Sequence, residues 1–121
     1  MTSDKYMLIQ SFEEAKVWQK AQELAILVYT IFKNSKDYGF KDQMQRAAVS
    51  VSNNIAEGFE RQTNKELVRF LYVAKGSSGE TRSMNHLGKK LDYITIEQYE
   101  QIQNLCLEIS KMLAGFIKSC N

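Results

Sequence analysis

Apolar side chains recur at alternating spacings of three and four residues in four successive segments of the chain, which is the spacing of one face of an α-helix. The first segment follows Ser11, and Ser11 and Glu14 have the spacing of a capping box. We therefore expect the first helix to begin at Ser11 and to end before a connection at residues 34–39. So broad an apolar stripe is typical of a helix packed on a core. It contains Trp18, Ala21, Ala25, Val28 and Phe32, flanked by Val17, Leu24, Leu27 and Ile31.

A second helix is expected from about Lys41 to about Phe59, with Gly58 supplying the positive φ of a helix end. The third and fourth helices each follow a capping-box spacing, at residues 63–66 and 95–98. The third stripe continues to residue 91, so this helix should be the longest, about 40 Å at 5.4 Å per turn. The three stripes contain Met44, Ala47, Ala48, Val51, Ile55 and Phe59; then Leu67, Phe70, Ala74, Ser77, Thr81, Met84, Gly88 and Leu91; then Tyr99, Ile102, Cys106, Ile109, Leu113 and Phe116.

The connections between the four segments are short, and no segment has the alternation of a strand. Short connections make successive helices antiparallel, so the sequence predicts an all-α, up-down-up-down four-helix bundle. The absence of proline in 121 residues agrees with a helical chain. We expect residues 11–121 to form this bundle and residues 1–10 to be a flexible segment. Neither a membrane span nor a signal peptide is evident, so the expected location is the cytoplasm.

Few residues are suited to catalysis. The single histidine, His86, cannot supply the paired Glu-x-x-His units of di-iron bundles, and Ser83 precedes it by three residues. A nucleophilic pair of Cys106 and His86 is possible across two helices. It is a weak alternative, because no third orienting group is apparent. Cys106 and Cys120 lie in one predicted helix and cannot bridge within it. The sequence therefore predicts no enzyme, metal site or cofactor.

Polar residues share one face of the second predicted helix, beside its apolar stripe. At the edge of a core such groups need partners. We expect Arg46 and Glu57 to join a network with Glu80 and Arg82 on the next helix, and direct contact with a ligand is the less favoured alternative. The residues of this face are Gln43, Arg46, Ser50, Asn54 and Glu57.

Small residues interrupt the third predicted helix at Gly76, Ser77 and Gly79 without disturbing its periodicity. Small side chains allow backbones to approach closely, so we expect another helix or another subunit to pack there. A phosphate-binding loop is the alternative, which the unbroken helical pattern disfavours.

The basic residues are distributed unevenly. Residues 63–91 hold six basic and two acidic side chains, a net charge of +4, whereas the rest of the chain carries −2. Lys75, Arg82 and Lys89 are seven residues apart and so form a line along one side of the helix. No aromatic stacking platform is evident, because Trp18 and most phenylalanines lie on the apolar stripes. Candidate phosphate contacts are Arg46, Arg61, Lys65, Arg69, Lys75, Arg82 and Lys89.

Residues 42–58, DQMQRAAVSVSNNIAEG, resemble the signature of the 23S rRNA intervening-sequence protein family. Residues 70–80, FLYVAKGSSGE, and residues 12–18, FEEAKVW, are similar to two further motifs of that family. The sequence departs from the common pattern at two places. Many members have proline near the position of Ser52. In many members a bulky apolar residue follows the Gly-Ser pair, where this chain has Ser78 and Gly79.

The resemblance implies a bacterial four-helix bundle that assembles as a homopentameric ring. A similar bundle is the accessory protein of diversity-generating retroelements, where it pairs with a reverse transcriptase and structured RNA. Two hypotheses follow for this chain. The favoured one is a non-enzymatic homo-oligomer that binds structured RNA such as ribosomal RNA. The alternative is a scaffold that docks a protein partner, such as a reverse transcriptase or another enzyme.

Overall fold

The computed structural model describes residues 11–120, and the expectation of a flexible segment at residues 1–10 falls outside them. Within this range the chain forms helices and no strand, so the all-α prediction is confirmed. The elements are η1 (Phe12–Glu14), a single 3-10 turn, followed by the helices α2 (Lys16–Ile31), α3 (Tyr38–Phe59), α4 (Asn64–Lys90) and α5 (Ile96–Ser119).

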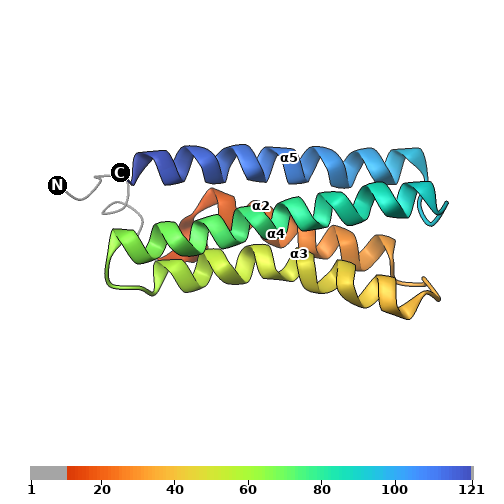
Figure 1. The fold of residues 1–121 in the computed structure, drawn as a ribbon, viewed down its shortest axis with the longest axis horizontal. Coiled ribbons are helices and arrows are strands. Elements are labelled where there is room, and N and C mark those ends of the chain that lie inside the picture. Colours follow the sequence, from red (N-terminus) through yellow and green to blue (C-terminus); the bar gives the residue numbers. More distant parts are fainter. Residues whose placement is uncertain (1–10, 121) are drawn as a thin grey trace.

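The four helices form a closed antiparallel bundle (Figure 1). Each helix packs against the helices before and after it, and α2 and α5 complete the ring. The α2–α3 and α4–α5 connections lie at one end, and the α3–α4 connection lies at the other. This is the predicted up-down-up-down topology, and α4 is the longest helix, as expected, with 27 residues.

The core is built mainly from the predicted apolar stripes, with Leu24, Met44, Leu67 and Ile109 among its completely buried side chains. The α4 stripe differs in part, because Leu91 is exposed and Leu71, which was not predicted, is completely buried. Small residues bring α3 and α4 especially close. A Cβ atom at Gly58 would lie 3.0 Å from the Cβ of Phe70 on α4. At the opposite end of this helix pair, a Cβ atom at Gly88 would lie 3.2 Å from Cζ of Phe40 on α3.

The predicted start of the first helix is wrong. Ser11 makes no side-chain cap hydrogen bond, and the chain forms one 3-10 turn before Ala15 adopts an extended conformation with φ −77° and ψ 122°. Ala15 is buried, and the ring of Phe12 packs edge-on against Trp18 with centroids 5.2 Å apart. Tertiary packing at this corner therefore decides that α2 begins at Lys16.

The second helix begins three residues earlier than predicted. The carboxylate of Asp37 accepts a hydrogen bond of 3.1 Å from the backbone N–H of Phe40 and caps α3, so Gly39 lies in the first turn. The predicted positive φ at Gly58 is also wrong, because the positive φ among the described residues is that of Asp92, at 59°. Gly58 instead permits the close approach of α4.

The caps of the last two helices follow the sequence closely. Thr95 and Gln98 form the complete capping box of α5. Thr63 accepts a hydrogen bond from the N–H of Glu66, but its hydroxyl also contacts the Glu66 carboxylate, so only the threonine half of the predicted box is present. α4 ends in a Schellman motif, in which the N–H of Tyr93 donates to the carbonyl of Gly88 at 2.9 Å.

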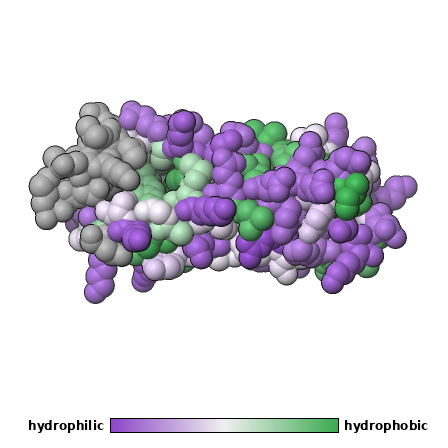
Figure 2. All heavy atoms as spheres, turned by 90° about the horizontal axis from the view of Figure 1, so that it is seen from above, coloured by the Kyte–Doolittle hydropathy of each residue, from purple (hydrophilic) through white to green (hydrophobic). Residues whose placement is uncertain are grey.

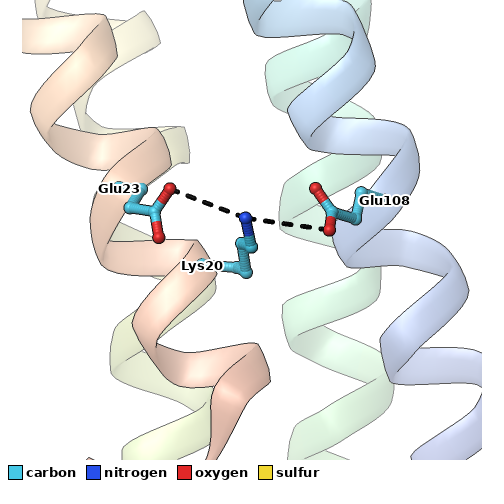
Figure 3. Close-up of polar contacts among 3 residues, drawn as sticks. All are labelled: Lys20, Glu23 and Glu108. Carbon is cyan, nitrogen blue, oxygen red and sulfur yellow. Dashed lines mark ion pairs between the residues drawn. The ribbon is translucent and has the colours of Figure 1, made fainter.

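Polar contacts join α2 to α5 and connect the loops at one end. Lys20 on α2 lies 3.8 Å from a carboxylate oxygen of Glu23 and 3.8 Å from one of Glu108 on α5 (Figure 3). The hydroxyl of Tyr93 donates a 2.7 Å hydrogen bond to Asp37, which links the α4–α5 loop to the cap of α3. No helix of residues 11–120 is both long and apolar enough to cross a lipid bilayer.

Candidate nucleic-acid interface

The predicted basic line of Lys75, Arg82 and Lys89 lies along the edge where α4 meets α5. Lys75 lines a hollow of about 340 Å³ between the two helices, together with Tyr72 on α4 and Lys118 on α5. A cation of α5 that sequence reasoning did not select therefore extends the line. We call Lys75, Arg82, Lys89 and Lys118 the basic edge.

Arg82 lies in the middle of this edge and is half-buried. It is close enough to Cys106 of α5 for its charge to act on that thiol. Burial raises the pKa of the Cys106 thiol to about 12, and the positive charge of Arg82 opposes that rise. The backbone of α5 is close here, because Ser78 on α4 donates a 3.1 Å hydrogen bond to the carbonyl of Cys106.

Lys89 lies at the loop end of the edge. Its ammonium group is 4.5 Å from the centroid of the Tyr99 ring, a cation–π contact between α4 and α5. The hydroxyl of Tyr99 lies 3.1 Å from Nδ1 of His86, and Nε2 of His86 lies 3.2 Å from Nε2 of Gln103. An aromatic ring and an imidazole thus accompany the cation.

The basic edge is free of acidic partners within the described part of the chain. Lys75, Arg82 and Lys89 form no ion pair with any carboxylate of residues 11–120. Glu108 of α5 faces away from the edge, because it contacts Lys20 on α2. Figure 2, which views the molecule from the α5 side, shows mostly hydrophilic side chains with separate apolar patches between them.

The other predicted basic residues are elsewhere. Arg46 bonds Asp42 on its own helix at 2.8 Å. Arg61, in the α3–α4 loop, has its guanidinium carbon 4.5 Å from the Phe70 ring centroid, and that of Arg69 lies 5.5 Å from the same ring. Lys65 is exposed in the first turn of α4. The seven candidates therefore do not form one surface.

The predicted network between α3 and α4 is also different. Arg46 and Glu57 do not reach Glu80 and Arg82, because Arg46 pairs with Asp42 and a carboxylate oxygen of Glu57 lies 4.0 Å from Arg61. These partners are four residues away on the same stretch of chain, a spacing that needs no second helix.

Short hydroxyls make the polar contact between α3 and α4. The side-chain oxygens of Ser50 and Ser77 are 2.9 Å apart, and the Asn54 amide donates a 2.9 Å hydrogen bond to Ser50. Short hydroxyl side chains thus connect α3 and α4, while the longer side chains of Gln43, Arg46, Glu57 and Glu80 are exposed.

A shallow groove of about 730 Å³ follows the outer side of α3. Arg46, Ser50, Asn54 and Glu57 line it, so four of the five predicted polar residues share one hollow. The remaining lining residues are Phe12, Tyr29, Val49, Asn53, Ala56 and Glu60.

Gly76 and Gly79 do not pack against another helix of the described chain. A Cβ atom at either position would have no atom within 4 Å apart from the neighbouring backbone of its own helix. Ser77 alone makes the close contact expected of this segment. The segment is continuous helix, so the alternative of a phosphate-binding loop is wrong.

Sequence reasoning missed two parts of the site. Tyr72 is 59% exposed, and Tyr99 is only half-buried, so aromatic rings do lie beside the basic line. Asn85 is completely buried, and its amide donates to the Tyr99 carbonyl at 2.9 Å and to the Gln103 side chain at 3.2 Å. The position of Asn85 on an apolar face indicated a buried polar residue. Its partners could not be predicted, because they lie on another helix.

The weak alternative of a Cys106 and His86 nucleophilic pair has no geometric support. Cys106 is buried against Ser78, with a pKa of about 12, whereas His86 is exposed and bonds Tyr99 and Gln103. A thiol with that pKa is protonated at neutral pH. Within residues 11–120, no three side chains of the metal-binding types form a group that could hold an ion.

The arrangement defines a small helical bundle with a basic, partly aromatic edge and a polar groove on a neighbouring helix. The family model of the 23S rRNA-intervening sequence proteins matches residues 13–115, so the chain belongs to that family. The motifs at residues 12–18, 42–58 and 70–80 are the parts of the sequence that indicated this.

A solved structure from Bacteroides thetaiotaomicron VPI-5482 has the same fold. It is described as a protein of unknown function from the S23 ribosomal protein family. The two chains are 31% identical, the match covers 84% of this chain and 98% of that one, and the TM-score is 0.80. No curated protein matches this chain.

Proposed function

We propose that the protein is a non-enzymatic bundle that binds structured RNA through its basic edge and acts as a homo-oligomer in the bacterial cytoplasm. The observation that carries the proposal is the row of Lys75, Arg82 and Lys89 along the α4–α5 contact, extended by Lys118 and without acidic partners in the described chain. Lysine and arginine in a row neutralise phosphates and release counterions, which gives salt-dependent affinity for nucleic acid.

Charge reversal tests this proposal. The triple variant Lys75→Glu, Arg82→Glu, Lys89→Glu should weaken binding of a structured RNA by more than about tenfold at low salt, since three phosphate contacts become repulsive. The matched control is Lys16→Glu, Lys33→Glu, Lys36→Glu, which changes the net charge equally at three exposed lysines away from the edge. Circular dichroism checks that both variants keep their helicity. Equal affinity of the first triple variant and the unaltered chain, or equal loss in the control, contradicts the proposal.

The same proposal assigns the α3 groove to contact between copies of the chain. Support comes from the mixed lining of the groove, where half-exposed Tyr29 lies among polar side chains. A ring of five copies would have a mass near five times the 14.0 kDa of one chain. Light scattering that finds a monomer at all concentrations contradicts self-association.

The second candidate function is a scaffold that docks a protein, such as a reverse transcriptase or another enzyme, and the α3 groove favours it because the groove contains uncharged as well as charged residues. Purification of the tagged chain from its host, with and without nuclease, separates the two functions. A partner protein that stays bound after nuclease treatment supports the scaffold. Loss of all bound material with nuclease supports RNA binding.

A further inference from the structure

We propose that the basic edge takes a single-stranded stretch of RNA, with Tyr72 and Tyr99 as platforms on which bases stack. This inference rests on the proposed function and adds to it the form of RNA that is bound. The observation behind it is that each end of the edge combines a lysine with a tyrosine: Lys75 with Tyr72 in the hollow, and Lys89 with Tyr99 in a cation–π contact.

At the first end, the ring of Tyr72 is 59% exposed beside the cations of Lys75 and Lys118. The hollow is completed by Ala114 and Ile117 of α5, which give it an uncharged, apolar wall. A base has an aromatic face for the tyrosine, and its phosphate has charge for the two lysines. Aromatic rings interleaved with cations are the usual means of binding single strands without sequence preference.

At the second end, the Lys89 ammonium occupies one face of the Tyr99 ring at 4.5 Å. A bound nucleotide can interact with both groups. Its base stacks on the Tyr99 ring in place of the ammonium, and its phosphate binds the Lys89 ammonium. The ring is held in place for this exchange by its hydroxyl, 3.1 Å from Nδ1 of His86. His86 is itself held by Gln103.

The two ends are far enough apart for several nucleotides. Lys75 and Lys89 are separated by 14 residues of continuous helix, a rise of about 21 Å, with Arg82 midway. Between the tyrosines, Gly76 and Gly79 leave the surface of α4 low, since a Cβ at either would meet nothing within 4 Å. An extended backbone can therefore lie close to the cations.

A duplex does not satisfy the same groups. Its bases are already stacked and paired, so their faces are not available to Tyr72 and Tyr99, and only the phosphates can contact the edge. Single-stranded loops and ends are the parts of a structured RNA that offer both base faces and phosphates. The edge thus favours unpaired segments over helices of the same RNA.

The test compares two labelled RNAs by fluorescence anisotropy at low salt: an unstructured 12-nucleotide strand and the 12-base-pair duplex of the same sequence. We expect the single strand to bind about tenfold more tightly. Tyr72→Ala should weaken single-strand binding by about 5- to 150-fold, the effect of losing one stacked base, and change duplex binding little. Tyr72→Phe should retain the affinity, because it keeps the ring.

Tyr38→Ala is the matched control, since Tyr38 is 72% exposed in the first turn of α3, away from the edge, and should change nothing. Tyr99→Ala is a second variant whose folding is checked by circular dichroism, because Tyr99 bonds His86. Equal binding of both RNAs that depends on Lys75, Arg82 and Lys89 but not on the tyrosines overturns this inference and leaves the proposed function standing. Failure of both RNAs to bind overturns both.

Discussion

The same substitution, glycine to alanine, should have opposite effects at two positions of this bundle. Gly58 is buried where α3 meets α4, and a Cβ there would lie 3.0 Å from Cβ of Phe70, 3.1 Å from Cδ1 of Leu67 and 3.3 Å from the carbonyl oxygen of Leu67. Carbon atoms attract one another best at about 3.5–4.0 Å, so the two carbon contacts are too short. Gly76 is exposed in the interior of α4, where a Cβ would meet no atom within 4 Å.

The magnitudes follow from these contacts. Overpacking of this kind costs about 1–3 kcal/mol. Alanine recovers at most about 1 kcal/mol of helix propensity, and less beside the end of α3. Gly58→Ala should therefore lower the free energy of unfolding by about 1–2 kcal/mol, which is a Tm lower by roughly 3–8 °C for a domain of this size. Gly76→Ala should raise the free energy of unfolding by about 0.5–1 kcal/mol, because only the propensity changes.

Thermal and urea unfolding followed by circular dichroism measures both variants, at one protein concentration because self-association would shift the transition. Gly115→Ala is a further control, since Gly115 is exposed in α5 and also has open space around it. A Gly58→Ala variant as stable as Gly76→Ala would refute the close packing of α3 and α4 described here.

Three further predictions concern caps, acid and thiols. Thr95→Ala should cost about 1 kcal/mol of unfolding free energy because it removes the complete capping box, whereas Ser11→Ala should cost nothing measurable in the same urea titration. The hydrogen bonds from Tyr93 and from the N–H of Phe40 lower the pKa of Asp37, so its carboxylate stabilises the fold above the ordinary value of 3.8 and this contribution is lost as the pH falls below it. Asp37→Asn keeps a capping side chain but has no carboxyl group to protonate. The stability of this variant should therefore fall less than that of the unaltered chain between about pH 5 and pH 3, and parallel curves of stability against pH would exclude the effect. At pH 8 a thiol reagent should modify Cys106 only on unfolding, since burial raises its pKa to about 12, and rapid reaction of two thiols in the native protein would contradict its burial.

The fold follows from the sequence wherever a local signal and the packing agree. Thr95 begins α5 as predicted because its cap, the capping-box partner and the apolar stripe all indicate the same start. At Ser11 they disagree, because burying Ala15 and packing Phe12 edge-on against Trp18 require a break that the capping pattern does not contain. The cap of α3 by Asp37 was missed because Gly39 indicated a turn and no acidic or amide residue follows three positions later.

The sequence predicts only the part of the candidate site that lies on α4. The spacing of Lys75, Arg82 and Lys89 places them on one side of α4, but which helix lies beside that side depends on the arrangement of the bundle. The contribution of Lys118 and the position of Tyr99 under Lys89 therefore needed the structure. The expected ion pairs between Arg46 and α4 do not form, because a nearer partner, Asp42, lies in the same helix as Arg46.

Ultraviolet cross-linking of the intact protein to a structured RNA with unpaired loops, followed by mass spectrometry of the peptides, tests most directly the claim that the α4–α5 edge binds RNA. If the α4–α5 edge is the binding surface, cross-links should concentrate at residues 72–75, 82–89, 99–103 and 114–118. Cross-links concentrated at residues 42–60 of α3 and its loop, or no cross-links under conditions where a known RNA-binding protein is labelled, would contradict it.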